Sequence, residues 1–165
     1  MIPTTPKSRR FLRAFTLIEL MVTLAIMAVL VTVAVPLMQV SLQRERERDL
    51  RSALTTIRDG IDAYKRASDQ GRIPVRVGES GYPVALNQLV EGIVDQRSPS
   101  RQKIYFLRRL PQDPMVDPAQ QTGDTNWGLR SYISPADAPA EGVDIFDVFS
   151  RSNKVGLNGV PYREW

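Results

Sequence analysis

The sequence predicts an α+β protein in which a long N-terminal helix, half transmembrane and half amphipathic, packs on a small C-terminal antiparallel sheet. Three observations carry this prediction. An uncharged apolar stretch follows a basic N-terminus, an amphipathic helical pattern continues from it, and segments with strand character lie near the C-terminus. The chain has 165 residues, which is enough for one compact domain and an appendage.

Residues 1–14 are predicted to form a basic leader. They contain Lys7, Arg9, Arg10 and Arg13 and no acidic residue. Taking these four from the 22 basic residues of the chain leaves 18, which equals the number of acidic residues. The body of the chain is therefore formally neutral, and the basic surface typical of nucleic-acid-binding proteins is missing from it. We expect no nucleic-acid partner.

Residues 20–38 are predicted to cross a membrane. No charged side chain interrupts the stretch LMVTLAIMAVLVTVAVPLM. At about 1.5 Å per residue it measures roughly 28 Å, close to the thickness of a hydrocarbon core. Because short basic segments stay in the cytoplasm, we expect a cytoplasmic N-terminus and a periplasmic C-terminal body.

Two other interpretations of this segment stay open. A cleaved secretory signal peptide has the same order of basic and apolar regions, although its apolar region is only about 7–15 residues long. An ordinary signal anchor without special processing fits the length. Neither accounts for Glu19, because a carboxylate at the edge of a membrane span costs free energy unless it has a partner.

Glu19 gains a partner if the chain is cut before Phe15. The new α-amino group then lies four residues ahead of Glu19, on the same face of the helix. The ammonium of the same chain, or that of a neighbouring chain in a filament, would neutralise the carboxylate.

The segment RAFTLIEL at residues 13–20, followed by the long apolar helix, resembles the class III signal of type IV pilins and pseudopilins. The resemblance implies that a prepilin peptidase cuts between Ala14 and Phe15 and methylates the Phe15 nitrogen. It also implies an inner-membrane protein that polymerises through residues 15–42, with Glu19 paired to the Phe15 amine of an adjacent subunit. The family usually has Gly before the cut, whereas this chain has Ala14.

Pro36 lies inside the predicted span, where a proline removes a backbone hydrogen bond and kinks or locally melts the helix. Its place resembles the pilin family, in which a proline in the middle of the N-terminal helix marks the segment that can unfold in the assembled filament. The resemblance thus makes Pro36 an assembly residue together with Glu19. An ordinary transmembrane proline is the alternative, since neighbouring helices satisfy the freed carbonyl.

Residues 43–70 are predicted to continue the same helix with an amphipathic pattern. Apolar side chains recur at spacings of four and three, which places them on one core-facing stripe. Gly60 lowers helix propensity without ending the helix, and Gly71 with Pro74 gives the predicted stop. The stripe consists of Leu50, Leu54, Ile57, Ile61 and Tyr64.

Residues 71–165 are predicted to form a periplasmic head. We expect a short helix in residues 84–90, an apolar segment in residues 104–110, and a turn-rich loop after it. Strand character appears in residues 127–134, 143–150 and 160–165. The Asn158-Gly159 dipeptide predicts a tight turn between short antiparallel segments.

Short motifs along the head resemble the major pseudopilin, the G subunit, of type II secretion. The resemblance implies a pilin-like fold and a structural subunit of a type II secretion pseudopilus that supports protein export. It implies as partners other copies of the chain, other pseudopilins, prepilin peptidase and the inner-membrane secretion platform. The motifs follow in the family's order: GRIP at 71–74, Tyr82-Pro83, LPQDP at 110–114, WG at 127–128, FDVFS at 146–150 and the final Trp165.

The resemblance also implies a calcium site in the loop after the FDVFS segment. Calcium takes roughly six to eight oxygen ligands, with carboxylates among them, but residues 151–161 contain no acidic residue and include Arg151 and Lys154. We therefore expect the site to be lost or replaced by hydrogen bonding. Asp144 and Asp147 are predicted to lie on the solvated face of their strand rather than to bind a metal.

The chain lacks two of the side-chain types most often used in catalysis. The chain has no Cys and no His, which excludes a disulfide framework, a Cys-type zinc site and the usual general base. A membrane-anchored periplasmic enzyme would need a carboxylate pair or a Ser-Lys arrangement, and neither has a recognisable spacing here. We predict a non-enzymatic protein without a cofactor. A subunit of a type IV pilus or a DNA-uptake pilus remains as the alternative.

Overall fold

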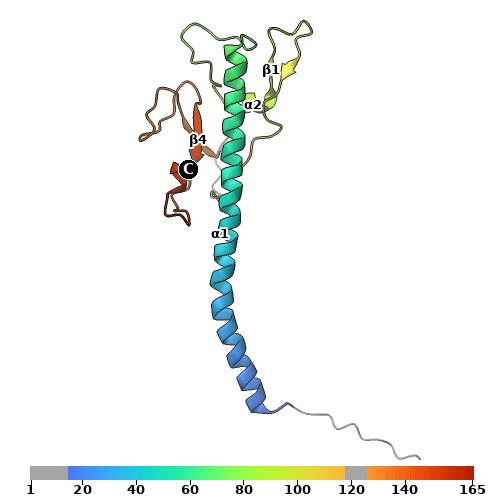
Figure 1. The fold of residues 1–165 in the computed structure, drawn as a ribbon, viewed down its shortest axis with the longest axis vertical. Helices are drawn as coiled ribbons and strands as arrows, with labels where there is room; N and C mark the ends of the chain where they lie inside the picture. Colours follow the sequence, from blue (N-terminus) through green and yellow to red (C-terminus); the bar gives the residue numbers. More distant parts are fainter. Residues whose placement is uncertain (1–14, 118–125) are drawn as a thin grey trace, which may run out of the picture. The chain divides into compact units, whose positions relative to one another are not determined.

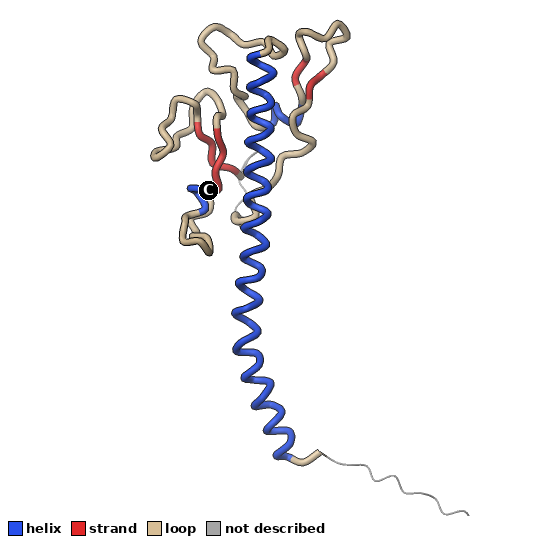
Figure 2. Tube along the Cα trace, viewed as in Figure 1, coloured by secondary structure: helices blue, strands red, loops and turns tan. Residues whose placement is uncertain are grey.

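The computed structural model describes residues 15–117 and 126–165. The chain divides into two compact units, Met1–Ser41 and Leu42–Trp165. Figures 1 and 2 show the helices and strands. Their order is α1 (Leu17–Asp69), α2 (Asn87–Glu91), β1 (Ile93–Val94), β2 (Lys103–Ile104), β3 (Trp127–Arg130), β4 (Asp147–Ser150) and the 3-10 helix η2 (Tyr162–Glu164). The predicted α+β class with one long N-terminal helix is confirmed.

Both ends of α1 carry recognisable caps. At the start, the Oγ1 of Thr16 accepts the N–H of Glu19 at 3.3 Å, and a carboxylate in the first turn is favoured by the helix dipole. At the end, the N–H of Gly71 donates to the carbonyl of Ser68 and that of Arg72 to the carbonyl of Ala67. With Gly71 at a φ of 68°, this is a Schellman motif. The predicted stop at Gly71 is confirmed.

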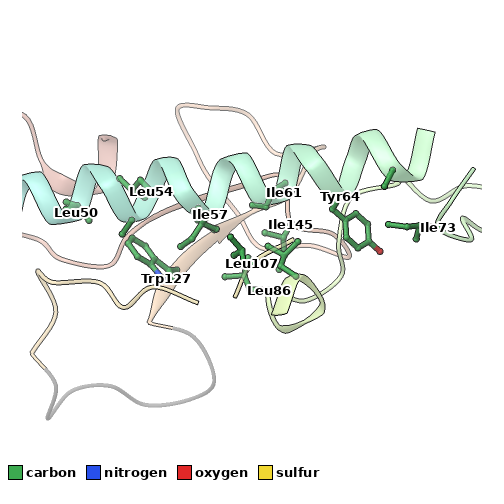
Figure 3. Close-up of a cluster of buried hydrophobic side chains, with 14 of the residues drawn as sticks. Leu50, Leu54, Ile57, Ile61, Tyr64, Ile73, Leu86, Leu107, Trp127 and Ile145 are labelled. Carbon is green, nitrogen blue, oxygen red and sulfur yellow. The ribbon is translucent and has the colours of Figure 1, made fainter. Parts of the chain in front are cut away.

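The hydrophobic core lies along one side of α1 in the unit Leu42–Trp165. All five residues of the predicted stripe are buried, and Figure 3 shows them projecting from the helix toward side chains of the rest of the unit. Gly60 belongs to the same side, because a Cβ on it would lie 3.0 Å from the Cγ of Leu107. The main partners of the stripe are Ile73, Leu86, Leu89, Leu107, Trp127, Ile145, Val148 and Tyr162.

Two short antiparallel ribbons make up the β-structure. β1 pairs with β2, with Ile93 opposite Ile104, and β3 pairs with β4, with Gly128 opposite Phe149. A Cβ on Gly128 would come within 2.2 Å of the Phe149 ring, so glycine leaves room for that ring against the backbone. The β1–β2 ribbon was not predicted, because two-residue strands are too short to show a period of two.

The expected strand at residues 160–165 is wrong. Val155 and Pro161 form a single antiparallel bridge, and η2 follows at once. Pro161 has no N–H with which to extend a β-ladder. The side chain of Tyr162, which follows it, is buried in the core and is 1% exposed. The predicted tight turn at Asn158-Gly159 lies between the two residues of this bridge, and it is confirmed by Gly159, whose φ is 79°.

The expectation that Asp144 and Asp147 lie on a solvated strand face is also wrong. Asp144 is buried and accepts hydrogen bonds from the Oγ of Ser131 at 2.5 Å and the N–H of Tyr132 at 3.0 Å. Asp147 is half-buried and pairs with Arg58 at 2.8 Å and with Arg130 at 3.4 Å. The period-two pattern failed because each carboxylate finds donors inside the head.

Candidate assembly surface

The apolar part of α1 has no protein covering in the described chain. From Leu17 to Leu42 every large apolar side chain is exposed, and α1 is long and apolar enough to cross a membrane. An apolar surface of this extent is stable only against lipid or against other protein. Residues 17–42 therefore form the candidate assembly surface.

Glu19 is the only charged residue on this surface. It lies in the first turn of α1 and is exposed. Phe15 lies just before the helix and is 75% exposed, whereas Ala14 falls outside the described residues. The predicted carboxylate and the predicted new N-terminus are thus four residues apart in sequence, at the beginning of the helix, and their pairing stays a prediction.

Pro36 lies within α1, which is continuous on both sides of it. Since proline has no N–H, the carbonyl of Thr32 four residues earlier lacks its usual helical donor. The hydroxyl of Thr32 itself donates to the carbonyl of Val29 at 2.7 Å. The weakness of the helix at Pro36 and its unfolding in a filament stay predictions.

Sequence reasoning missed Thr16 as a functional neighbour of Glu19. The pattern Thr16-x-x-Glu19 is the signature of a capping box, in which a hydroxyl and a carboxylate three residues apart serve the first turn. The prediction treated Glu19 only as a charge in a membrane span. The structure shows the Thr16 half of this motif, in which the Thr16 hydroxyl accepts the backbone N–H of Glu19 and so caps the start of the helix.

A second polar site, at Glu47, was also missed. Glu47 is 6% exposed, and its Oε1 accepts the N–H of Leu157 at 2.8 Å, the hydroxyl of Tyr162 at 2.9 Å and the Nε2 of Gln43 at 3.3 Å. Burial raises the pKa of Tyr162, so its hydroxyl keeps the proton that it donates. The spacing from Glu47 to Leu50 continues the core stripe by one turn, and that periodicity could have revealed it.

Two further carboxylates of the head have lowered pKa values. The guanidinium of Arg72 donates to Asp95 from Nε at 3.0 Å and from Nη2 at 2.7 Å, which lowers the pKa of Asp95. Burial alone would raise the pKa of Asp144, but hydrogen bonds from Ser131, Ser80 and Tyr132 outweigh it, and the pKa is lowered. These groups are structural partners inside the head.

Comparisons with known proteins identify the family. Residues 9–35 match the prokaryotic N-terminal methylation motif. The chain is 31% identical over 156 residues to type II secretion system core protein G of Klebsiella pneumoniae, a match that covers 90% of this chain and 87% of that protein. The chain belongs to the type II secretion system core protein G family.

Two further core protein G relatives support this membership. That of Klebsiella michiganensis is 28% identical over 82% of this chain and 91% of its own length. That of Aeromonas hydrophila is 26% identical over 73% of this chain and 79% of its own length. No solved structure matches the chain significantly.

Membership in the core protein G family confirms the predicted resemblance to the G subunit and the assignment to type II secretion pseudopilins. With the methylation motif and the exposed apolar helix, the chain is a single-pass inner-membrane protein. The relatives named above give no support to the alternative of a type IV pilus or DNA-uptake pilus subunit.

Proposed function

We propose that this chain is a structural subunit of the type II secretion pseudopilus, trimmed between Ala14 and Phe15 and assembled through α1 to support protein export. The observation that carries the proposal is the exposed apolar surface of residues 17–42 with its single carboxylate in the first turn. Such a surface suits a chain that leaves the bilayer and packs against copies of itself.

The proposed orientation follows from charge. The basic leader stays cytoplasmic, where prepilin peptidase removes it and methylates the Phe15 nitrogen, and the head lies in the periplasm. The segment just beyond the span, RERERD at residues 44–49, has as many acidic as basic residues. It therefore offers no competing positive charge.

Assembly is proposed to give the carboxylate of Glu19 a cationic partner that it lacks in the precursor. In the precursor, the backbone of Glu19 is held by Thr16 and its carboxylate has no cation within the described part of the chain to pair with at salt-bridge distance. Cleavage creates an α-ammonium at Phe15. In a bundle of apolar helices the carboxylate loses its solvent, and an unpaired buried charge is strongly destabilising. Pairing Glu19 with the ammonium of an adjacent subunit then fixes the register between neighbours.

The role is structural rather than enzymatic. We propose other copies of the chain, other pseudopilins and the inner-membrane secretion platform as partners, and prepilin peptidase as the processing enzyme. The composition supports this, since the chain has no Cys or His. No nucleic-acid partner is proposed, because the charge beyond the leader is balanced.

Intact-mass measurement of the membrane-extracted protein tests the proposal. In cells with prepilin peptidase, the mass should correspond to residues 15–165 plus one methyl group. In cells lacking the peptidase, the full chain should be recovered. A variant with Ala14→Glu should stay at full length even with the peptidase, whereas Ala14→Gly should be processed. An unshortened wild-type protein in the presence of an active peptidase would reject the proposed processing.

A further inference from the structure

The loop that follows β4, residues 151–161, closes on itself through its backbone. The N–H of Gly156 donates to the carbonyl of Val160 at 2.9 Å, that of Gly159 to Gly156 at 2.9 Å, and that of Tyr162 to Lys154 at 3.1 Å. The carbonyl oxygens of Lys154, Gly156 and Val160 therefore each accept a hydrogen bond from a protein donor.

Glu47 ties this closed loop to α1. One carboxylate oxygen accepts both the N–H of Leu157, in the middle of the loop, and the hydroxyl of Tyr162, just after it. Gln43, one turn earlier on α1, donates to that hydroxyl at 3.0 Å and to Glu47 at 3.3 Å. A buried carboxylate that receives several hydrogen bonds is well satisfied without a cation.

The residues present do not fit the calcium site that the family implies for this loop. Arg151 and Lys154 are its charged side chains, and both would repel a divalent cation. Asp113, which is close to the start of the loop, is 1% exposed and already accepts the hydroxyl of Ser150 at 2.6 Å and the N–H of Met115 at 2.8 Å. Within residues 15–117 and 126–165, no group of three metal-ligating side chains is clustered to hold a metal ion.

We infer that Glu47 is a positioning residue that fastens loop 151–161 to α1 by hydrogen bonds, so that the head keeps this loop closed without a divalent cation. The hydrogen bonds to the Glu47 carboxylate hold the loop in place, as a metal ion bound within the loop would otherwise do. The inference concerns the folded head alone and does not depend on processing or filament assembly.

Tryptic cleavage after Lys154, followed by mass spectrometry, reads the state of the loop directly. The full chain in detergent should be cleaved there at the same slow rate in excess calcium chloride and in excess EGTA. Thermal unfolding, followed through the tryptophan emission to which the buried Trp127 contributes, should likewise have the same midpoint in both solutions. A loop that calcium protects, or a midpoint that EGTA lowers, would overturn the inference.

Substitution of Glu47 tests the fastening itself. Glu47→Ala should speed cleavage after Lys154 roughly tenfold or more, because a loop without its buried acceptor opens more often. Glu45→Ala is the matched control, since Glu45 is an exposed acid two residues away on the same helix, and it should behave like the wild type. Equal cleavage of Glu47→Ala and wild type would overturn the inference.

Two more variants separate hydrogen bonding from charge and guard against unfolding. Glu47→Gln keeps an acceptor oxygen without the charge and should be cleaved at a rate nearer to wild type than to Glu47→Ala. Cleavage of Glu47→Gln as fast as Glu47→Ala would contradict the hydrogen-bonding role. Tryptophan emission shows whether Glu47→Ala is folded. If it is unfolded, Tyr162→Phe, which removes one donor to Glu47, is used in its place and should open the loop. A loop unaffected by Tyr162→Phe would contradict the inference.

Discussion

Two carboxylates on α1, Glu19 and Glu47, have different roles in the two parts of the helix. Glu19 is a carboxylate on an otherwise apolar surface, and Glu47 is a carboxylate at the start of a core stripe. The same side chain type thus serves different ends because its surroundings differ. Glu47 accepts hydrogen bonds from donors of its own chain, whereas Glu19 is proposed to pair with the Phe15 ammonium of another chain.

Replacing Glu19 should prevent assembly while leaving membrane insertion intact. In Glu19→Gln the carboxylate that would pair with a neighbouring Phe15 ammonium is gone, and leaving one partner of a buried pair alone costs about 3–5 kcal/mol. We expect the yield of sheared or cross-linked filaments to fall by more than tenfold, and the variant to be extracted from membranes like wild type. Thr23→Val, on the same helix, should assemble normally. Wild-type filament yield from Glu19→Gln would contradict the pairing.

The Arg72–Asp95 pair should make head stability depend on acid pH. The pKa of Asp95 is lowered by Arg72, so its contribution is complete above the unfolded value of about 3.9 and is lost as the pH falls through the lower folded value. Thermal unfolding midpoints should therefore favour wild type over Asp95→Asn at neutral pH, with a difference that vanishes in strong acid. Asp59→Asn, at an exposed position, should show no such trend. A difference independent of pH would argue against the pair.

At the scale of elements, α1 joins a surface to a core within one continuous helix. Its stripe from Leu50 to Tyr64 supplies one wall of the core, and the rest comes from α2, the β3–β4 ribbon, η2 and the loops between them. The regular spacing of the stripe made this half of α1 predictable from sequence. Gly60 fits the same logic, since its lack of a side chain admits Leu107 against the helix.

Filling the space at Gly60 should destabilise the head. In Gly60→Val the added methyl groups meet Leu107, and overpacking of this kind typically costs about 1–3 kcal/mol. Chemical denaturation followed by circular dichroism should show that loss. Thr55→Val, at an exposed position on the same helix, should stay close to wild type. If Gly60→Val is as stable as wild type, the close approach of Leu107 to the helix is not a constraint.

At the scale of the whole molecule, the two units differ in the surroundings in which they are stable. Residues 17–41 expose apolar side chains throughout, and residues 42–165 have their own buried core. The first unit needs lipid or other subunits, while the second has the burial pattern of a water-soluble domain. The boundary between them falls between Ser41 and Leu42.

A fragment of residues 42–165 should fold alone in water. It keeps the whole core stripe, both ribbons and the contacts of Glu47. Size-exclusion chromatography with light scattering should give a monomer without detergent, and unfolding should be a single cooperative transition. The full chain should need detergent to stay monomeric. Aggregation of the fragment would mean that the head depends on the preceding segment.

Much of this architecture could be predicted because strong periodic patterns specify it. The span, the stripe and the Gly71 stop each rest on local physical chemistry and were correct. The β1–β2 ribbon was not predicted because its strands have only two residues each, and η2 because Pro161 ends the β-ladder. The burial of Asp144 was not predicted because its donors, Ser131 and Tyr132, come from another segment. Glu47 shows the same limit: its spacing on the helix is visible in the sequence, but its partners Leu157 and Tyr162 are more than a hundred residues away.

The row of core residues on α1 has a mechanical consequence. Because Leu50, Leu54, Ile57, Ile61 and Tyr64 all interlock with the rest of the head, a pull along the helix axis acts on all of these contacts in shear and at the same time. A domain hung from a terminal linker would instead be peeled away one contact after another. The head is thus built to move together with the Leu50–Tyr64 segment of α1 when that segment is pushed or drawn.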